Sequence, residues 1–149
     1  MRVAFDTNVV LDLLLDREPW SLAAARLFSR VEGGELEGYV CATTITTIHY
    51  LATKAVGSKQ AREEILKLLT LCAVAPVDQR VLQRAVELDF SDFEDAVIHE
   101  ACRLAAVDVL VTQDLEGFKR ATVRTLSPEE FLSVLEQREA TTAPEATDD

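Results

Sequence analysis

Three aspartates, Asp6, Asp95 and Asp114, carry the strongest chemical signal in this sequence. Asp6 interrupts the apolar run MRVAFDTNVVLDLLL, and a buried carboxylate is costly unless a partner offsets its charge. Carboxylate oxygens are the ligands that hard divalent cations such as Mg²⁺ prefer. A cation held in this way can activate water and polarise a phosphoryl oxygen, which is the chemistry of phosphodiester hydrolysis. This chemistry requires a fold that brings the three aspartates together.

The elements that must position these residues alternate between strands and helices. Apolar runs predict short strands at residues 2–5, 38–42, 74–75, 109–111 and 123–126. Helical periodicity predicts helices at residues 9–15, 20–31, 43–56, 58–72, 79–88 and 92–106, and a last one from 128. This alternation is typical of an α/β fold with a parallel sheet, and right-handed crossovers place helices on both of its faces.

Two of the helix starts are specified by their local sequence. Ser91 and Glu94 have the spacing of a capping box, which predicts a helix that begins at Asp92. Ser127 followed by Pro128 predicts an N-cap and a first helical residue for the last helix.

The predicted topology places all three aspartates at one edge of the sheet. Asp6 follows the first strand directly, and Asp114 comes two residues after Thr112, where the fourth strand ends. Asp95 lies in the first turn of the helix that leads into the fourth strand, so that turn begins at the same edge. Ligands of open α/β sheets bind beyond the carboxyl ends of the strands. We therefore expect a metal site at this edge.

Each aspartate also has an ordinary structural interpretation. Asp6 could be only the N-cap of the following helix, and Asp114 could be a turn or N-cap residue. Asp95 is harder to explain in this way, because helical spacing places it in the apolar stripe of Ile98 and Cys102. Three inward-facing acids at one edge favour a metal site over three separate caps.

The net charge of −11 limits how the protein could bind nucleic acid. Proteins that hold phosphates through basic residues are usually positively charged. Bound metal ions, or a basic partner protein, would reverse the charge locally at an acidic site. The chain of 149 residues is long enough for one domain with a proper core.

Composition also bears on location and domain organisation. No run approaches the roughly 18 apolar residues of a membrane helix, and MRVAFD lacks the apolar region of a signal peptide. Cys41, Cys72 and Cys102 are odd in number and widely spaced, which is typical of reduced core cysteines in a cytoplasmic protein. We expect one domain over residues 1–135 and an acidic, disordered tail over 136–149.

Three motifs, in their order and spacing, resemble the PIN domain family, a nuclease fold that includes VapC-like toxin ribonucleases. They are FDTNVVLDLL, SDFEDAVIHEACR and LVTQDLEGF, and the terminal SPEEFL extends the resemblance to about residue 135. It implies a three-layer α/β/α fold with a five-stranded parallel sheet of order 3-2-1-4-5. The implied metal ligands and catalytic residues are Asp6, Asp95 and Asp114, supported by Thr7, Asn8 and Thr112.

The same resemblance implies an activity and partners. The chain would be an endoribonuclease that uses Mg²⁺ or Mn²⁺ to hydrolyse RNA, and the toxin of a toxin–antitoxin module. Its partners would be an RNA substrate and a small antitoxin protein; homodimers are common in the family, and nothing points to a membrane.

The sequence departs from the family in one respect. Many PIN domains carry a glutamate in the helix after the second strand, but here that helix reads TTITTIHYLATK. Asp92, one turn before Asp95, is a candidate for a fourth carboxylate ligand, and it could equally be a solvated first-turn acid. The missing glutamate leaves open how many metal ions the site would hold.

Other functions fit the sequence less well. A catalytically weak PIN-fold module that acts through protein contacts would explain the missing glutamate and the acidic surface. A haloacid-dehalogenase-type phosphatase requires an aspartate two residues after the first one, where this chain has Asn8. A phospho-receiver requires a phosphoacceptor aspartate after the third strand, where the chain offers only Asp78.

Overall fold

Five parallel strands form a single sheet at the centre of the protein. A computed structural model describes residues 1–142 of the chain. The strand order is β3-β2-β1-β4-β5, and every neighbouring pair is parallel, which confirms the predicted sheet. The strands are β1 (Arg2–Phe5), β2 (Glu37–Cys41), β3 (Ala73–Ala75), β4 (Val109–Val111) and β5 (Arg124–Leu126).

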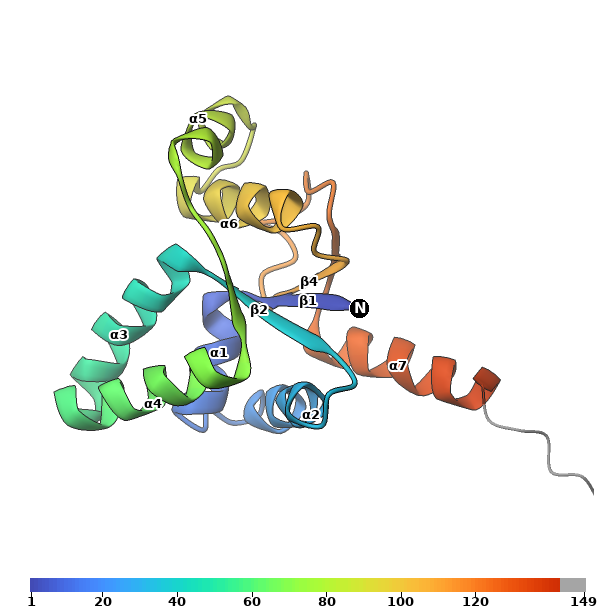
Figure 1. Ribbon diagram of the computed structural model, residues 1–149. Helices are drawn as coiled ribbons and strands as arrows, with labels where there is room; N and C mark the ends of the chain where they lie inside the picture. The colour runs from blue at the N-terminus through green and yellow to red at the C-terminus, as the bar shows by residue number, and fades with distance from the viewer. Residues whose placement is uncertain (143–149) are drawn as a thin grey trace, which may run out of the picture.

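Helices cover both faces of the sheet, as the alternation of elements predicts. Figure 1 shows α5 and α6 on one side of β1 and β4, with α1, α2 and α7 on the other; α3 and α4 form a hairpin beside them. The helices are α1 (Thr7–Leu14), α2 (Ser21–Glu32), α3 (Ala42–Val56), α4 (Ser58–Leu71), α5 (Gln79–Glu87), α6 (Phe93–Leu104) and α7 (Pro128–Thr142).

The central strands supply side chains to two separate cores. Val3 and Phe5 of β1 pack into the cluster with α1, α2 and α7, whereas Ala4 packs into the cluster with α5 and α6. This follows from the two-residue period of a strand, whose successive side chains point to opposite faces. Because both faces are covered, β1 and β4 are almost wholly apolar.

The two central strands end side by side at the edge where the aspartates were expected. Phe5 pairs with Val111 in the register of β1 and β4, and the amide of Asp6 donates to the carbonyl of Val111 at 2.9 Å. The chain leaves β1 toward β2 on one side, while β4 lies on the other side. The ends of β1 and β4 therefore form a topological switch point, where α/β folds bind ligands.

The two predicted helix starts had different outcomes. Ser127 caps α7 as predicted, because its Oγ accepts the amide of Glu130 at 3.1 Å. The prediction that Ser91 caps α6 was wrong. Asp92 is the N-cap instead, and its carboxylate accepts the amide of Glu94 at 2.8 Å and that of Asp95 at 3.4 Å.

The last helix extends beyond the predicted domain boundary at residue 135. Helix α7 continues to Thr142, where the hydroxyls of Thr141 and Thr142 bond back to carbonyls one turn earlier. Glu139 of α7 also forms an ion pair with Arg30 of α2. Residues 136–142 are thus helical rather than disordered, and the remainder of the predicted tail lies outside the described residues.

Other expectations from composition concern the cysteines and the membrane. Cys41, Cys72 and Cys102 are all buried and none forms a disulfide, as predicted. None of the helices within residues 1–142 combines the length and the apolar character that crossing a bilayer requires.

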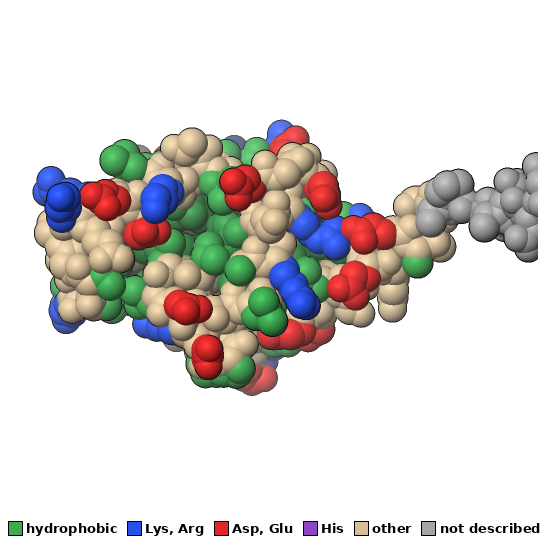
Figure 2. All heavy atoms as spheres, turned by 90° about the horizontal axis from the view of Figure 1, so that it is seen from below, with side chains coloured by type: hydrophobic (Ala, Val, Ile, Leu, Met, Phe, Trp, Pro, Cys, Tyr) green, Lys and Arg blue, Asp and Glu red, His purple; other side chains and the backbone are tan. Residues whose placement is uncertain are grey.

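The face seen from below has an apolar centre. Figure 2 shows hydrophobic side chains gathered in the middle of this face, with charges of both signs scattered around them. A groove of about 280 Å³ lies between α1, α2 and α4. Its apolar lining residues are Leu13, Leu14, Phe28, Leu68 and Leu71.

Candidate active site

Carboxylates from three segments of the chain line one pocket at the ends of β1 and β4. This cavity of about 230 Å³, which we call the acidic pocket, brings together the three predicted residues Asp6, Asp95 and Asp114. Asp6 follows β1, Asp114 follows β4, and Asp95 belongs to the first turn of α6. The other residues that line it are Thr7, Asn8, Leu11, Arg17, Thr47, Asp92, Glu94 and Ile98.

Asp6 both caps α1 and faces the acidic pocket. One carboxylate oxygen accepts the amide of Thr7 at 2.8 Å, and the other accepts the hydroxyl of Thr112 at 2.7 Å. The side-chain nitrogen of Asn8, Nδ2, donates to that second oxygen at 3.3 Å. The cap and the site are therefore compatible interpretations of this residue, which is only 5% exposed.

Thr112 couples the ends of the two central strands. Its buried hydroxyl donates to Asp6 and accepts the amide of Asp114 at 3.0 Å. Asn8 forms a second link, since its side-chain oxygen accepts the amide of Gln113 at 3.2 Å. Thr112 and Asn8 thus tie the orientation of Asp6 to the segment that carries Asp114.

Thr7 connects the pocket to α3 rather than to Asp114. Its amide contacts Asp6, and its hydroxyl lies 3.3 Å from that of Thr44, which is wholly buried. All three predicted supporting residues therefore contact Asp6.

Burial and neighbouring acids raise the pKa values of two carboxyl groups in this pocket, Asp95 and Asp6. Burial, followed by the nearby charges of Asp6, Asp92, Asp114 and Glu94, raises the pKa of Asp95 to about 7. Burial also raises the pKa of Asp6, although the hydrogen bonds from Thr112 and Thr7 counteract this effect. A bound cation would favour the ionised form of these carboxyl groups.

The donor set fits a hard divalent cation. All the charged oxygens that line the pocket are carboxylates, and Cys or His ligands for zinc are absent from the lining. Within residues 1–142, no three His, Cys, Asp or Glu side chains are already spaced closely enough to hold an ion. The carboxylates therefore share a pocket without meeting at one point, and an ion would have to draw them together.

Gly117 keeps open the space between two of the acids. A Cβ atom at this position would lie 2.5 Å from Oδ2 of Asp114 and 2.9 Å from Oδ2 of Asp95. The Gly117 amide also donates to Oδ1 of Asp114 at 3.0 Å. The absence of a side chain at this position leaves room for both carboxylates.

Gly117→Ala is expected to leave the protein folded and to weaken divalent-cation binding about tenfold, because the added methyl group displaces the flexible carboxylate of Asp114. Calorimetric titration with Mn²⁺ measures this effect. Gly33→Ala is the matched control, since its Cβ would meet only ordinary contacts. Equal Mn²⁺ affinity in both variants would show that the space at Gly117 is unimportant.

Two charged residues of the pocket, Glu94 and Arg17, were not predicted from the sequence. Glu94 was considered only as a capping residue, yet its carboxylate lines the pocket and accepts the hydroxyl of Thr47 at 3.3 Å. Glu94 could have been predicted as a pocket residue because it directly precedes Asp95. Arg17 is the one cationic side chain among the described lining residues. Its loop between α1 and α2 carries no recognisable motif.

Asp92 both lines the pocket and caps α6. Its carboxylate lines the pocket, but one of its oxygens is engaged by the two amides that it caps. Asp92 and Glu94 are thus both candidates for a fourth carboxylate.

The sequence and the fold were compared with those of known proteins. A family model described as "PIN domain" matches residues 2–116. A search of curated proteins found no significant match.

Solved structures share the fold at low sequence identity. A toxin–antitoxin complex from Klebsiella pneumoniae is 20% identical, with a TM-score of 0.65 over 85% of this chain and 97% of that one. VapBC2 from Rickettsia felis, bound to a promoter DNA fragment, is 13% identical, with a TM-score of 0.65 over 85% of this chain and 98% of that one. VapC20 from Mycobacterium tuberculosis, a toxin that cleaves the sarcin–ricin loop, is 17% identical, with a TM-score of 0.59 over 72% and 86%.

Proposed function

The chain belongs to the PIN domain family, and from this premise we propose that it is a divalent-metal-dependent endoribonuclease. The observation that carries the proposal is the convergence of Asp6, Asp95 and Asp114 on one pocket at the topological switch point. These residues come from three segments far apart in the sequence. Three separate helix caps would not be required to line one pocket.

The residues of the pocket divide into ligands and positioning groups. Asp6, Asp95 and Asp114 would hold Mg²⁺ or Mn²⁺, with Glu94 as a fourth carboxylate. When bound, the ion would lower the pKa of a water molecule and neutralise charge on the phosphoryl group. Thr112 holds the carboxylate of Asp6 toward the pocket through its 2.7 Å hydrogen bond.

Cleavage of single-stranded RNA by the purified protein tests this function. We expect cleavage with Mg²⁺ or Mn²⁺, loss of cleavage with EDTA, and recovery when the ion is restored. Calorimetry on the same samples measures cation binding separately. If the protein bound neither the cation nor RNA, that result would contradict the proposal. Cation binding without cleavage would favour a catalytically weak PIN-fold module that acts through protein contacts.

Arg17 is well placed to contact the RNA backbone. It lines the acidic pocket together with five carboxylates, and its backbone amide bonds to the carbonyl of Asp12 at 3.0 Å, which fixes the start of its loop. A guanidinium group binds phosphate oxygens strongly because it can donate two parallel hydrogen bonds. Arg17 would thus hold the phosphate beside the ion.

Arg17→Met is expected to lower cleavage of RNA about tenfold, mainly through weaker substrate binding, while cation affinity stays unchanged or rises. Single-turnover kinetics over a range of RNA concentrations separate these effects. Arg26→Met, on the exposed side of α2, is the control for loss of one positive charge. A fall in cleavage of equal size in both variants would indicate a general charge effect rather than a phosphate contact.

We further propose that the protein is the toxin of a toxin–antitoxin module in the cytoplasm. Several solved structures of this fold are toxin–antitoxin complexes, including the one from Klebsiella pneumoniae. An antitoxin could place a basic side chain in the acidic pocket and apolar side chains in the groove between α1, α2 and α4. Homodimer formation, common in the family, is part of the same proposal.

The toxin proposal has a direct test. Expression of the chain alone should arrest growth, and co-expression with a small protein encoded by the neighbouring gene should relieve the arrest and yield a complex. Growth that is unaffected by the chain at high expression would contradict the toxin role but not the ribonuclease activity.

A further inference from the structure

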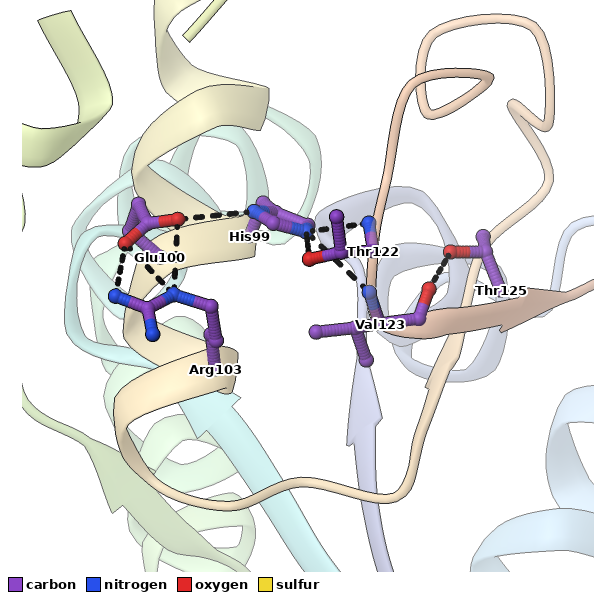
Figure 3. A network of polar contacts seen from close by, with 6 residues as sticks. All are labelled: His99, Glu100, Arg103, Thr122, Val123 and Thr125. Atoms are coloured by element: carbon purple, nitrogen blue, oxygen red, sulfur yellow. Dashed lines mark hydrogen bonds and ion pairs between the residues drawn. The ribbon is translucent and has the colours of Figure 1, made fainter. Parts of the chain in front are cut away.

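A buried histidine lies one turn after Asp95 on α6 and contacts the loop that carries Asp114. This loop, residues 113–123, connects β4 to β5. Figure 3 shows the ring of His99 pointing from α6 toward Thr122 and Val123 at the far end of the loop. The His99 side chain is only 1% exposed, whereas Thr122 is exposed, so the contact is partly buried. None of the functions argued above uses this residue.

Three donors converge on one nitrogen of the His99 ring. Nε2 lies 3.0 Å from the amide of Thr122, 3.2 Å from its hydroxyl and 3.4 Å from the amide of Val123. A backbone N–H can only donate, so Nε2 must act as the acceptor. These hydrogen bonds between the loop and α6 can therefore form only while Nε2 carries no proton.

The other side of the ring faces an ion pair that selects this tautomer. Nδ1 lies 3.3 Å from Oε1 of Glu100, a close contact that is not a well-aligned hydrogen bond. Glu100 is 3% exposed and is held by Arg103, whose Nη2 lies 2.9 Å from Oε2 (Figure 3). The carboxylate favours a proton on Nδ1, which leaves the Nε2 lone pair free for the loop.

The start of the loop is attached to the site separately. The amide of Asp114 donates to Thr112, and the amide of Gly117 donates to Asp114. Between the two attachments, Phe118 is buried and packs edge-on against Phe90, with the ring centroids 6.0 Å apart. The far end of the loop thus has two polar attachments, an exposed ion pair of Arg120 with Asp89 and the contact with His99, and the second leads back to the helix that carries Asp95.

We propose that His99 is a positioning residue that fixes the loop bearing Asp114 to the helix bearing Asp95, and that protonation of its Nε2 releases this attachment. The proposal rests on the proposed function, because it concerns the spacing of two carboxylates that would hold the metal. Asp95 lies one helical turn before His99 on α6, and the same loop passes close to Asp95 at Gly117, where a Cβ atom would lie 2.9 Å from Oδ2 of Asp95.

The surroundings of His99 keep it neutral near neutral pH. Burial lowers the pKa of His99, and the positive charge of Arg103 acts in the same direction, whereas Glu100 partly counteracts both. From the other elements, the ring of Phe90 lies 5.3 Å away, and the 113–123 loop presents the amides and hydroxyl already described. The hydrogen bonds to Nε2 should therefore persist at neutral pH and break at a pH below the ordinary pKa of histidine.

Two substitutions at position 99 separate the anchor from the packing. In His99→Gln, the side-chain oxygen lies the same number of bonds from Cα as Nε2 does, so it can accept the same amides but does not titrate. In His99→Leu, the acceptor is lost while apolar packing is kept. His49→Leu on α3 is the control for loss of the other histidine.

Amide hydrogen exchange at Thr122 and Val123, measured by NMR on the full chain without metal, tests the anchor directly. We expect His99→Leu to reduce protection at these amides about tenfold, and His99→Gln and His49→Leu to preserve it. In the wild type, the chemical shifts of both amides should also change together at a pH below the ordinary pKa of histidine. In His99→Gln they should not change in this way. Unchanged protection of these two amides in His99→Leu would contradict the proposal that His99 anchors the loop.

Metal binding and cleavage then test whether the anchor matters for the site. His99→Leu should weaken Mn²⁺ binding and lower kcat about tenfold, with little change in KM for RNA, and His99→Gln should recover most of both. Lost protection with unchanged Mn²⁺ affinity would contradict the positioning role. If the wild type neither binds Mn²⁺ nor cleaves RNA, the proposed function fails, while the exchange experiment still decides the anchor.

Discussion

Asp95→Asn is expected to abolish RNA cleavage and, at the same time, to stabilise the metal-free protein. The loss should exceed about 100-fold, because even the partners of metal ligands contribute about 10–100-fold. The gain in stability follows from the environment of Asp95. Burial and four neighbouring acids raise its pKa to about 7, so at pH above 7 the folded protein holds a carboxylate that would be better solvated in the unfolded chain.

The pH dependence of this effect has a definite sign. A carboxyl group with a raised pKa in the folded state contributes stability below its unfolded value of 3.8, and this contribution is lost as the pH rises through about 7. Asp95→Asn should therefore raise the free energy of unfolding above pH 7 by about 1–2 kcal/mol, a figure reduced for partial solvent exposure. Below pH 3.8, where Asp95 is protonated in both states, the gain should disappear.

Urea unfolding with EDTA at both ends of this pH range measures the stability change, and an RNA cleavage assay measures the activity. Asp108→Asn is the matched control, because Asp108 lies at the opposite edge of the sheet and its oxygen only accepts the amide of Arg2. Addition of Mg²⁺ should stabilise the wild type but not Asp95→Asn. A variant that is destabilised at high pH would contradict the argument from mutual repulsion.

Glu94→Gln is expected to weaken divalent-cation binding by about 10–100-fold, and a second substitution, Thr47→Glu, is expected to restore part of that loss. The hydroxyl of Thr47 on α3 lies 3.3 Å from Oε1 of Glu94 on α6, and both residues line the acidic pocket. A carboxylate at either position would therefore reach the same space. Glu94 of α6 would thus supply the carboxylate that many PIN domains carry on the helix that corresponds to α3.

Calorimetric titration with Mn²⁺ of the wild type, Glu94→Gln and the double variant tests this replacement. Glutamine keeps an oxygen that can accept the Thr47 hydroxyl, so the substitution removes the charge and little else. Glu87→Gln, at the exposed end of α5, controls for the overall charge. If Glu94→Gln binds Mn²⁺ as tightly as the wild type, Glu94 is a surface acid and the site has three carboxylates.

The elements and their order were predictable because they depend on local patterns. The apolar run before Asp6, the periodicity of α4 and the Ser127–Pro128 pair each specify an element from a few neighbouring residues. Alternation of strands and helices then determines a parallel sheet and the edge at which it binds ligands. The meeting of Asp6, Asp95 and Asp114 follows from that topology alone, without knowledge of any side-chain contact.

Local rules failed where two candidates competed or where helix length was decided by distant contacts. Ser91 and Asp92 both suit an N-cap, and only the backbone at Asp92 decides which side chain meets the free amides. The extension of α7 to Thr142 is accompanied by the contact of Glu139 with Arg30, a residue more than one hundred positions away. Composition alone marked this segment as a tail.

The sequence by itself therefore determined the fold, the ligand-binding edge and the three aspartates that meet there. Only the tertiary structure decided what surrounds them: Glu94 bonded to Thr47, Arg17 in the lining of the pocket, and His99 bonded to Thr122. Backbone topology follows from periodic patterns, which short stretches of sequence encode. The neighbours of a side chain depend on how helices and loops from distant segments pack against each other, and no single stretch of sequence records that arrangement.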